Sequence, residues 1–123
     1  MKPTLLVSSL AALFVLAAAP AAQAHRCGAR LGPLQGTVDA KCKPASKTTC
    51  TAGGPAKSCA TLTGLFNAAR ECKAARVAVN NCYQPPDKGH LDAVKVVGQQ
   101  VVTCQRLMQN ACAAERRNNN KKK

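Results

Sequence analysis

The chain has 123 residues, eight of them cysteine, and its 18 basic residues outnumber 5 acidic ones to give a formal net charge of +13. A chain of this length forms one small domain. After residue 24 its only aromatic residues are Phe66 and Tyr83, which argues against a protein that reads single-stranded nucleic acid by base stacking. The charge favours an anionic partner, namely nucleic acid, a membrane surface, a glycan or an acidic protein. Solubility of an exported protein explains it equally well.

Residues 1–24 have the pattern of a secretory signal peptide. Lys2 gives a positive start, Leu5–Ala19 is uncharged and largely apolar, and Ala22–Ala24 provides a small-x-small cleavage site, so the mature chain would begin at His25. The apolar run is shorter than the roughly 20 residues that span a bilayer, and no later stretch is long and apolar enough. We therefore expect a secreted or periplasmic protein without a transmembrane segment in its mature chain.

The cysteines predict a disulfide framework. An even number of cysteines in a small exported chain is typical of disulfide bonding, whereas zinc sites favour C-x-x-C spacings, which are absent from this sequence. With so few aromatic residues, crosslinks would supply stability that a thin core cannot. The eight cysteines are Cys27, Cys42, Cys50, Cys59, Cys72, Cys82, Cys104 and Cys112.

Two segments of the mature chain have little helical periodicity. Residues 25–57 are rich in glycine and proline, which punctuate turns, so they predict a loop-rich arm with at most a short helix around Thr37–Lys43. At the other end, the polar and basic composition of residues 116–123 predicts a disordered tail, which we bound at residues 118–123.

Residues 58–117 predict a helical hairpin. Pro85 and Pro86 interrupt the helical pattern in the connection Tyr83–Gly89, Asp87 can cap the second helix, and Asp92 would lie in its first turn. The apolar positions recur at helical spacing: Leu62, Leu65, Ala69, Cys72, Val79 and Tyr83, then Val94, Val97, Val101, Cys104, Leu107, Met108 and Ala111. Because the connection is short, the helices would be antiparallel neighbours. The predicted fold is all-α: a disulfide-stapled antiparallel helical hairpin with a loop-rich N-terminal arm.

Helix geometry predicts some of the disulfides. Cys72 would lie roughly 16 Å from the connection and Cys104 roughly 21–24 Å, and both face the seam, so we expect them to pair. Cys59 and Cys112 are at similar heights, but Cys59 lies about 140° around the helix from Cys72, so this pair requires an irregular first turn. Cys82 lies beside the connection and should bond to the arm. If both interhelical pairs form, the other four cysteines retain three connectivities.

His90 is the first candidate for chemistry. It would be about the third residue of the second helix, where the positive end of the helix dipole favours a neutral imidazole able to act as a general base. Arg76 and Asp92 are its candidate catalytic companions, with Tyr83 and Asp87 nearby. A structural explanation competes: His90 packs on Tyr83 or caps the turn, and the two aspartates are ordinary helix-start residues. No nucleophile motif, phosphate loop or metal-ligand pattern is present, so no cofactor is expected.

The region around the connection resembles a known family. Asn81-Cys82-Tyr83, then Asp87-x-Gly89-His90, Ala93 and Cys104 are similar to a pattern in C-terminal domains of bacterial polymorphic toxins of the novel toxin 16 type. The resemblance covers the hairpin from Cys59 to Met108. It implies a toxin effector with nuclease-like action, in which the family's Gly-His step corresponds to Gly89-His90.

A metal site is a third hypothesis. A mature chain beginning with His25 would offer an α-amine and an imidazole on one residue, and with His90 these match the three nitrogens of a copper-binding histidine brace. A histidine at the cleavage point by chance explains the same observation. The sequence thus leaves three functions open: an exported binding or effector-like protein acting on an anionic partner, a secreted toxin with RNase-like activity, and a copper-binding protein.

Overall fold

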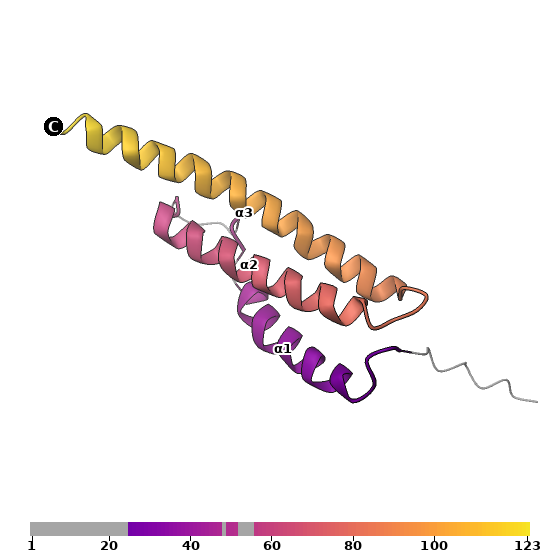
Figure 1. Cartoon of the computed structure of the whole chain (residues 1–123). Helices are drawn as coiled ribbons and strands as arrows, with labels where there is room; N and C mark the ends of the chain where they lie inside the picture. The colour runs from indigo at the N-terminus through magenta and orange to yellow at the C-terminus, as the bar shows by residue number, and fades with distance from the viewer. Residues whose placement is uncertain (1–24, 48, 52–55) are drawn as a thin grey trace, which may run out of the picture.

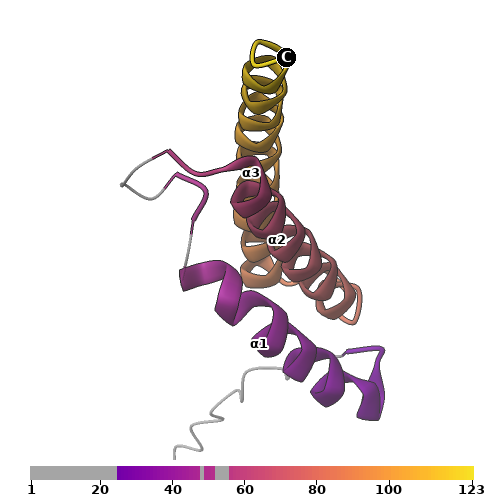
Figure 2. The same ribbon diagram turned by 90° about the vertical axis from the view of Figure 1, so that its left-hand side faces the viewer.

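A computed structural model describes residues 25–47, 49–51 and 56–123. A 3₁₀ turn, Gly28–Arg30, precedes three helices: α1 (Leu31–Lys47), α2 (Cys59–Asn80) and α3 (Lys88–Asn120). Figure 1 shows α2 and α3 antiparallel, with α1 packed against α2, and Figure 2 shows α1 crossing α2 obliquely. The all-α fold with its antiparallel hairpin is confirmed. The predicted signal peptide lies outside the described residues.

Both helices of the hairpin begin at side-chain caps. The Ser58 hydroxyl accepts a hydrogen bond from the Thr61 backbone N–H at 3.1 Å, and the Asp87 carboxylate accepts one from the His90 backbone N–H at 3.0 Å. Each cap satisfies a backbone donor that has no partner within the first turn. The predicted role of Asp87 is therefore confirmed.

The N-terminal arm differs from the prediction. A loop-rich segment with one short helix is wrong, because α1 runs for 17 residues. Pro33 is near its start, where an N–H has no helical partner anyway, although Pro44 lies inside the helix. With two glycines and two prolines, α1 has a weak helix propensity of its own, and it is held by the disulfide from Cys42 to Cys72 of α2. Tertiary attachment therefore compensates for weak local propensity.

All eight cysteines are paired, and the pairing corrects one prediction. Cys82 bonds to the arm, as expected, but Cys72 does not bond to Cys104. Cys59 bonds to Cys112 although α2 is helical from Cys59, so the irregular first turn that the sequence required for this pair is not needed. The bonds are Cys27–Cys82, Cys42–Cys72, Cys50–Cys104 and Cys59–Cys112.

The hairpin register explains the error. With Cys59 opposite Cys112, Cys72 is 13 positions along α2 while Cys104 is only 8 positions back along α3. The difference is an axial offset of roughly 7.5 Å, beyond the usual Cα–Cα span of a disulfide. The two cysteines instead bond to the arm, Cys72 through Cys42 and Cys104 through Cys50.

The disulfides also form much of the core. The largest fully buried side chains are Cys72, Cys82 and Cys104. One cluster of buried residues joins α1 to the hairpin: Cys42, Ala45, Cys72 and Val97. A second lies nearer the start of α2: Cys50, Leu62 and Cys104, with Phe66 and Leu107 among the residues packed on it. Since large apolar side chains are scarce, crosslinks replace part of the usual hydrophobic burial.

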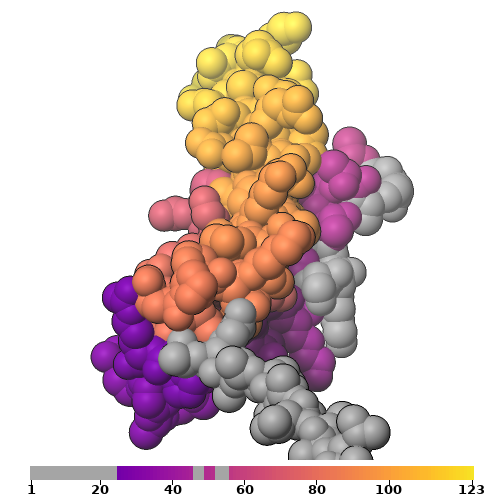
Figure 3. All heavy atoms as spheres, turned by 90° about the vertical axis from the view of Figure 1, so that its right-hand side faces the viewer, coloured from indigo at the N-terminus to yellow at the C-terminus, as the bar shows by residue number. Residues whose placement is uncertain are grey.

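The C-terminal end of α3 stands clear of the other helices. Cys112 is bonded to the first residue of α2, so the residues after it extend past α2 (Figures 1 and 3). A disordered tail over residues 118–123 is wrong for residues 118–120, which are helical. Propagating an existing helix costs little, and basic residues such as Arg117 favour its C-terminal end. Among the described residues, no helix is long and apolar enough to cross a membrane.

Candidate functional site

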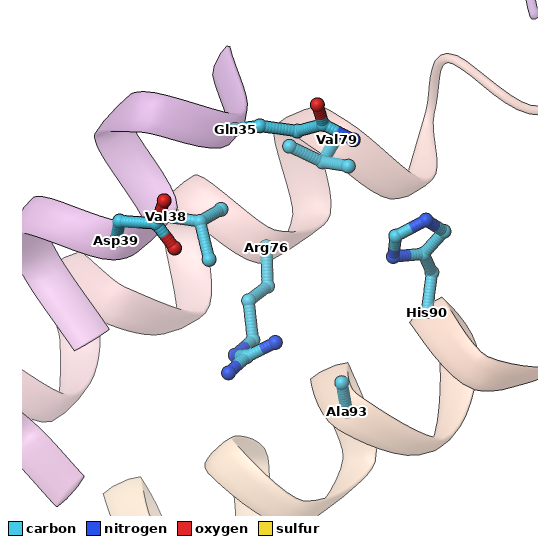
Figure 4. Close-up of a pocket in the computed structure, with 7 residues that line it drawn as sticks. All are labelled: Gln35, Val38, Asp39, Arg76, Val79, His90 and Ala93. Carbon is cyan, nitrogen blue, oxygen red and sulfur yellow. The ribbon is translucent and has the colours of Figure 1, made fainter. Parts of the chain in front are cut away.

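A pocket opens where all three helices approach the connection. Farther along, α1 and α3 meet through side chains: Val97 packs with Cys42 and Ala45, and the Gln100 side-chain amide donates to the Ala45 carbonyl at 3.1 Å. Nearer the connection lies a cavity of about 290 Å³. Its lining is Gln35, Val38 and Asp39 from α1, Arg76 and Val79 from α2, and His90 and Ala93 from α3 (Figure 4).

Arg76 places a cation in the middle of this pocket. The residue is half-buried, and its Nε is fully buried without a hydrogen-bond partner. Within the described part of the chain, its guanidinium forms no ion pair. A guanidinium presents five donors in a planar fork that suits carboxylates and phosphates. The structure thus leaves one donor of this guanidinium unsatisfied, which is costly in a buried position.

His90 is the third residue of α3, as predicted, and its side chain lines the pocket. Its backbone is fixed by the Asp87 cap, and its ring lies against Tyr83 with ring centroids 4.5 Å apart. Gly89 leaves space for that cap, since a Cβ there would lie 3.2 Å from Asp87 Oδ2. The packing of His90 on Tyr83 is confirmed, and the same imidazole also faces the cavity (Figure 4). The structural and chemical interpretations of His90 are thus compatible.

Asp92 is not among the residues that line the pocket. It is the fifth residue of α3, beyond the first turn where the sequence placed it, and it forms an exposed ion pair with Lys88 at 2.6 Å. The hydrogen bond and charge of Lys88 lower the pKa of the Asp92 carboxyl, and Asp92 raises the pKa of Lys88. The pair therefore favours the folded state while both groups are charged: its contribution is lost as pH falls through the lowered carboxyl pKa, or rises through the raised amine pKa. Exposure makes this contribution small.

Sequence reasoning missed the α1 side of the pocket. Gln35 and Asp39 lie one turn apart on α1 and face Arg76 and His90 from the other wall (Figure 4). They were overlooked because this segment was expected to be largely loop. Their i, i+4 spacing would have been informative only once a helix was assigned.

His25 contacts Tyr83, the residue on which His90 packs. The two residues form an isolated antiparallel bridge, and their rings meet edge to face with centroids 6.4 Å apart. His25 and His90 therefore both contact the Tyr83 ring. No cluster of three or more His, Cys, Asp or Glu side chains suited to a metal occurs among the described residues. The copper site at His25 and His90 stays a prediction.

The sequence of the chain also matches a known protein family. The model of the family described as novel toxin 16 matches residues 24–107. The chain belongs to the novel toxin 16 family. Neither curated proteins nor solved structures gave a significant match.

Membership of the novel toxin 16 family supports a toxin-like role. The matched residues include all of α1 and α2 and the part of α3 that lines the pocket. They end before Cys112 and before the projecting end of α3. In this novel toxin 16 member, the candidate site lies wholly within the family region, whereas the basic C-terminal end lies outside it.

Proposed function

We propose that the chain is an exported toxin that cleaves RNA, with Arg76 and His90 in the pocket between α1, α2 and α3. One observation carries the proposal: a guanidinium whose buried Nε lacks a partner shares a pocket with a half-exposed histidine. Family membership supports a toxin-like role, and the cation–imidazole pair supplies the chemistry.

RNA contains its own nucleophile, so the protein needs to supply only phosphate binding and proton transfer. The ribose 2′-hydroxyl attacks the adjacent phosphorus, the O5′ bond breaks, and a 2′,3′-cyclic phosphate and a free 5′-hydroxyl result. One proton leaves O2′ and one is added to O5′. Arg76 binds the phosphate oxygens and stabilises the negative charge that grows on them in the transition state. His90 takes part in the proton transfer.

The charge of the whole molecule helps it to meet this substrate. Of the net +13, Lys2 lies in the segment proposed as a signal peptide, so a mature chain would carry +12. Strong positive charge raises the rate of encounter with a phosphate backbone and makes binding sensitive to salt.

The first prediction tests His90. His90→Ala should lower the rate of RNA cleavage by about 10²- to 10⁴-fold, the usual contribution of a positioned acid–base group. Fold and disulfides should persist, since the Asp87 cap bonds to the backbone of residue 90. The measurement is cleavage of a labelled RNA by the oxidised protein, with toxicity on cytoplasmic expression as a second readout.

Asp92→Asn is the matched control, because it removes a charge from α3 outside the pocket. Its cleavage rate should remain within about twofold of the wild type, since an exposed ion pair contributes little. A His90→Ala protein as active as wild type would rule out the role of His90, and loss of activity in both variants would point to a general effect of α3.

Export forms part of the proposal. Disulfides form and persist in oxidising compartments, and eight paired cysteines are consistent with passage through one. Intact mass of the secreted or periplasmic protein should correspond to a chain beginning at His25 and lacking eight hydrogens relative to its reduced form. A retained residue 1–24 segment would contradict cleavage, and free thiols would contradict the framework.

A second candidate function is polyanion binding without catalysis. It is favoured by the projecting end of α3, whose exposed basic residues are Arg116, Arg117, Lys121, Lys122 and Lys123. Such a surface suits nucleic acid, a membrane surface, a glycan or an acidic protein. A protein that binds RNA with strong salt dependence but never cleaves it would favour this candidate over the RNase.

A further inference from the structure

Four of the five acidic residues have a structural partner, and the fifth does not. Glu71 pairs with Lys41, Asp92 pairs with Lys88, Asp87 caps α3, and Glu115 accepts from the Cys59 backbone N–H at 2.8 Å. The Asp39 carboxylate forms no hydrogen bond or ion pair with any described residue. In a chain with so few carboxylates, the one without a structural partner lines the pocket.

Asp39 and His90 approach the pocket from opposite walls. Asp39 comes from α1, His90 comes from α3, and Arg76 rises from α2 between them (Figure 4). In-line displacement at phosphorus places the attacking and leaving oxygens on opposite sides of the phosphate. A phosphate bound by Arg76 would therefore have one proton-transferring side chain on each side.

We propose that Asp39 is the general base of this site and His90 its general acid. The inference rests on the proposed RNase function and assigns the two proton transfers to separate residues. The Asp39 carboxylate accepts the proton of the 2′-hydroxyl as O2′ forms its bond to phosphorus. The imidazolium of His90 donates its proton to O5′ as the P–O5′ bond breaks. Each bond formed matches a bond broken, and no co-reactant is needed.

The division of roles follows from the two side chains. At neutral pH a carboxylate accepts protons, while an imidazole exists in both forms and can donate. The sequence alone made His90 the base, because the positive end of the helix dipole favours a neutral imidazole; in the pocket, the carboxylate of Asp39 takes that role instead. The charged groups facing Asp39 are Arg76 from α2 and His90 from α3, with Lys43 one turn along on α1.

Two substrates separate base from acid. The first is an oligodeoxynucleotide with a single ribonucleotide, whose O5′ leaving group needs a proton. The second is a nucleoside 3′-(4-nitrophenyl phosphate), whose leaving group departs without one. Asp39→Asn should slow both substrates by about 10²- to 10⁴-fold, whereas His90→Ala should slow the first by that factor and the second by less than tenfold. Glu71→Gln, an exposed charge loss outside the pocket, should slow neither.

The pH profile gives an independent readout. The wild-type rate should rise and then fall with pH, and Asp39→Asn should abolish the rise on the acidic side. Wild-type protein inactive on both substrates would overturn the RNase function itself. If the wild type is active and the Asp39→Asn variant cleaves both substrates at the same rates, only the role of Asp39 is overturned. An Asp39→Asn variant that cleaves next to different nucleobases but keeps the rise of the rate on the acidic side would also overturn it. That result would assign Asp39 to recognition of the nucleobase.

Discussion

Asp87 connects the stability of α3 to the position of its pocket histidine. Its carboxylate accepts from the His90 backbone N–H, so one hydrogen bond both starts the helix and fixes the residue that bears the imidazole. Asp87→Ala should lower the free energy of unfolding by about 0.5–2 kcal/mol, measured by urea denaturation. It should also lower the cleavage rate by roughly tenfold to hundredfold, because small displacements of catalytic groups are costly.

Ser58 offers the matched control for that variant. It caps α2 through the Thr61 N–H, at the end of α2 opposite the pocket. Ser58→Ala should lose a similar free energy of unfolding and keep the wild-type rate below its unfolding transition. Equal rate losses in the two variants would show that stability, and not the placement of His90, accounts for the effect of Asp87.

At the scale of residues, two of the seven residues that line the pocket, Arg76 and His90, were candidate site residues from the sequence alone. His90, Arg76 and the Asp87 cap follow from helical periodicity and from a helix start after two prolines. Asp39 does not, because its significance depends on α1 being a helix and on the other carboxylates being engaged in three-dimensional contacts. Asp92 was a candidate companion of His90 from the sequence, but it is exposed and pairs with Lys88.

Among the elements, α1 depends most on crosslinks. Its described buried side chains are only Cys42 and Ala45, and disulfides tie this part of the chain to α2 at Cys42–Cys72 and to the connection after α2 at Cys27–Cys82. Replacing Cys42 and Cys72 together with Ala should lower the free energy of unfolding by up to about 4 kcal/mol, from the entropy of a 30-residue loop. It should also release α1 from the pocket, measured as faster amide hydrogen exchange across residues 31–47 and loss of cleavage.

The Cys59–Cys112 bond provides the comparison. It closes a loop of 53 residues at the far end of the hairpin, so the entropic loss on its removal should be similar. Replacing both cysteines with Ala should leave exchange in α1 and the cleavage rate nearly unchanged. Slow exchange in α1 after loss of Cys42–Cys72 would mean that its apolar contacts with α2 hold it without the crosslink.

The elements differ in how far the sequence determines them. Apolar residues at helical spacing made the hairpin predictable. The α1 segment combines Gly32, Pro33, Gly36 and Pro44 with few apolar residues, so its local signal is that of a loop. Its helix depends on long-range bonds, which single-sequence periodicity does not encode. The same limitation explains the wrong Cys72–Cys104 pair, since the axial register of two helices is a tertiary property.

On the scale of the whole molecule, the candidate pocket and the exposed basic residues of α3 lie at opposite ends of the hairpin. The pocket lies near the connection between α2 and α3, while α3 carries exposed basic residues past the start of α2 at the other end (Figures 1 and 3). The family match covers the pocket and not the basic end of α3. We therefore expect that mutations can remove the chemistry of the pocket and the basic end of α3 independently of each other.

The final prediction therefore concerns the projecting end of α3. Replacing Arg116, Arg117, Lys121, Lys122 and Lys123 with Gln should weaken RNA binding and reduce the slope of log K against log salt by up to about 4, since each lost phosphate contact removes roughly 0.7–0.9. Cleavage of a dinucleotide too short to reach this end should stay at the wild-type rate. Substituting Arg70 and Lys73 of α2 with Gln controls for charge alone, and its effect per charge on the slope should be smaller. An equal effect per charge would mean that RNA follows the net charge of the protein, and an unchanged slope would mean that the projecting end does not bind it.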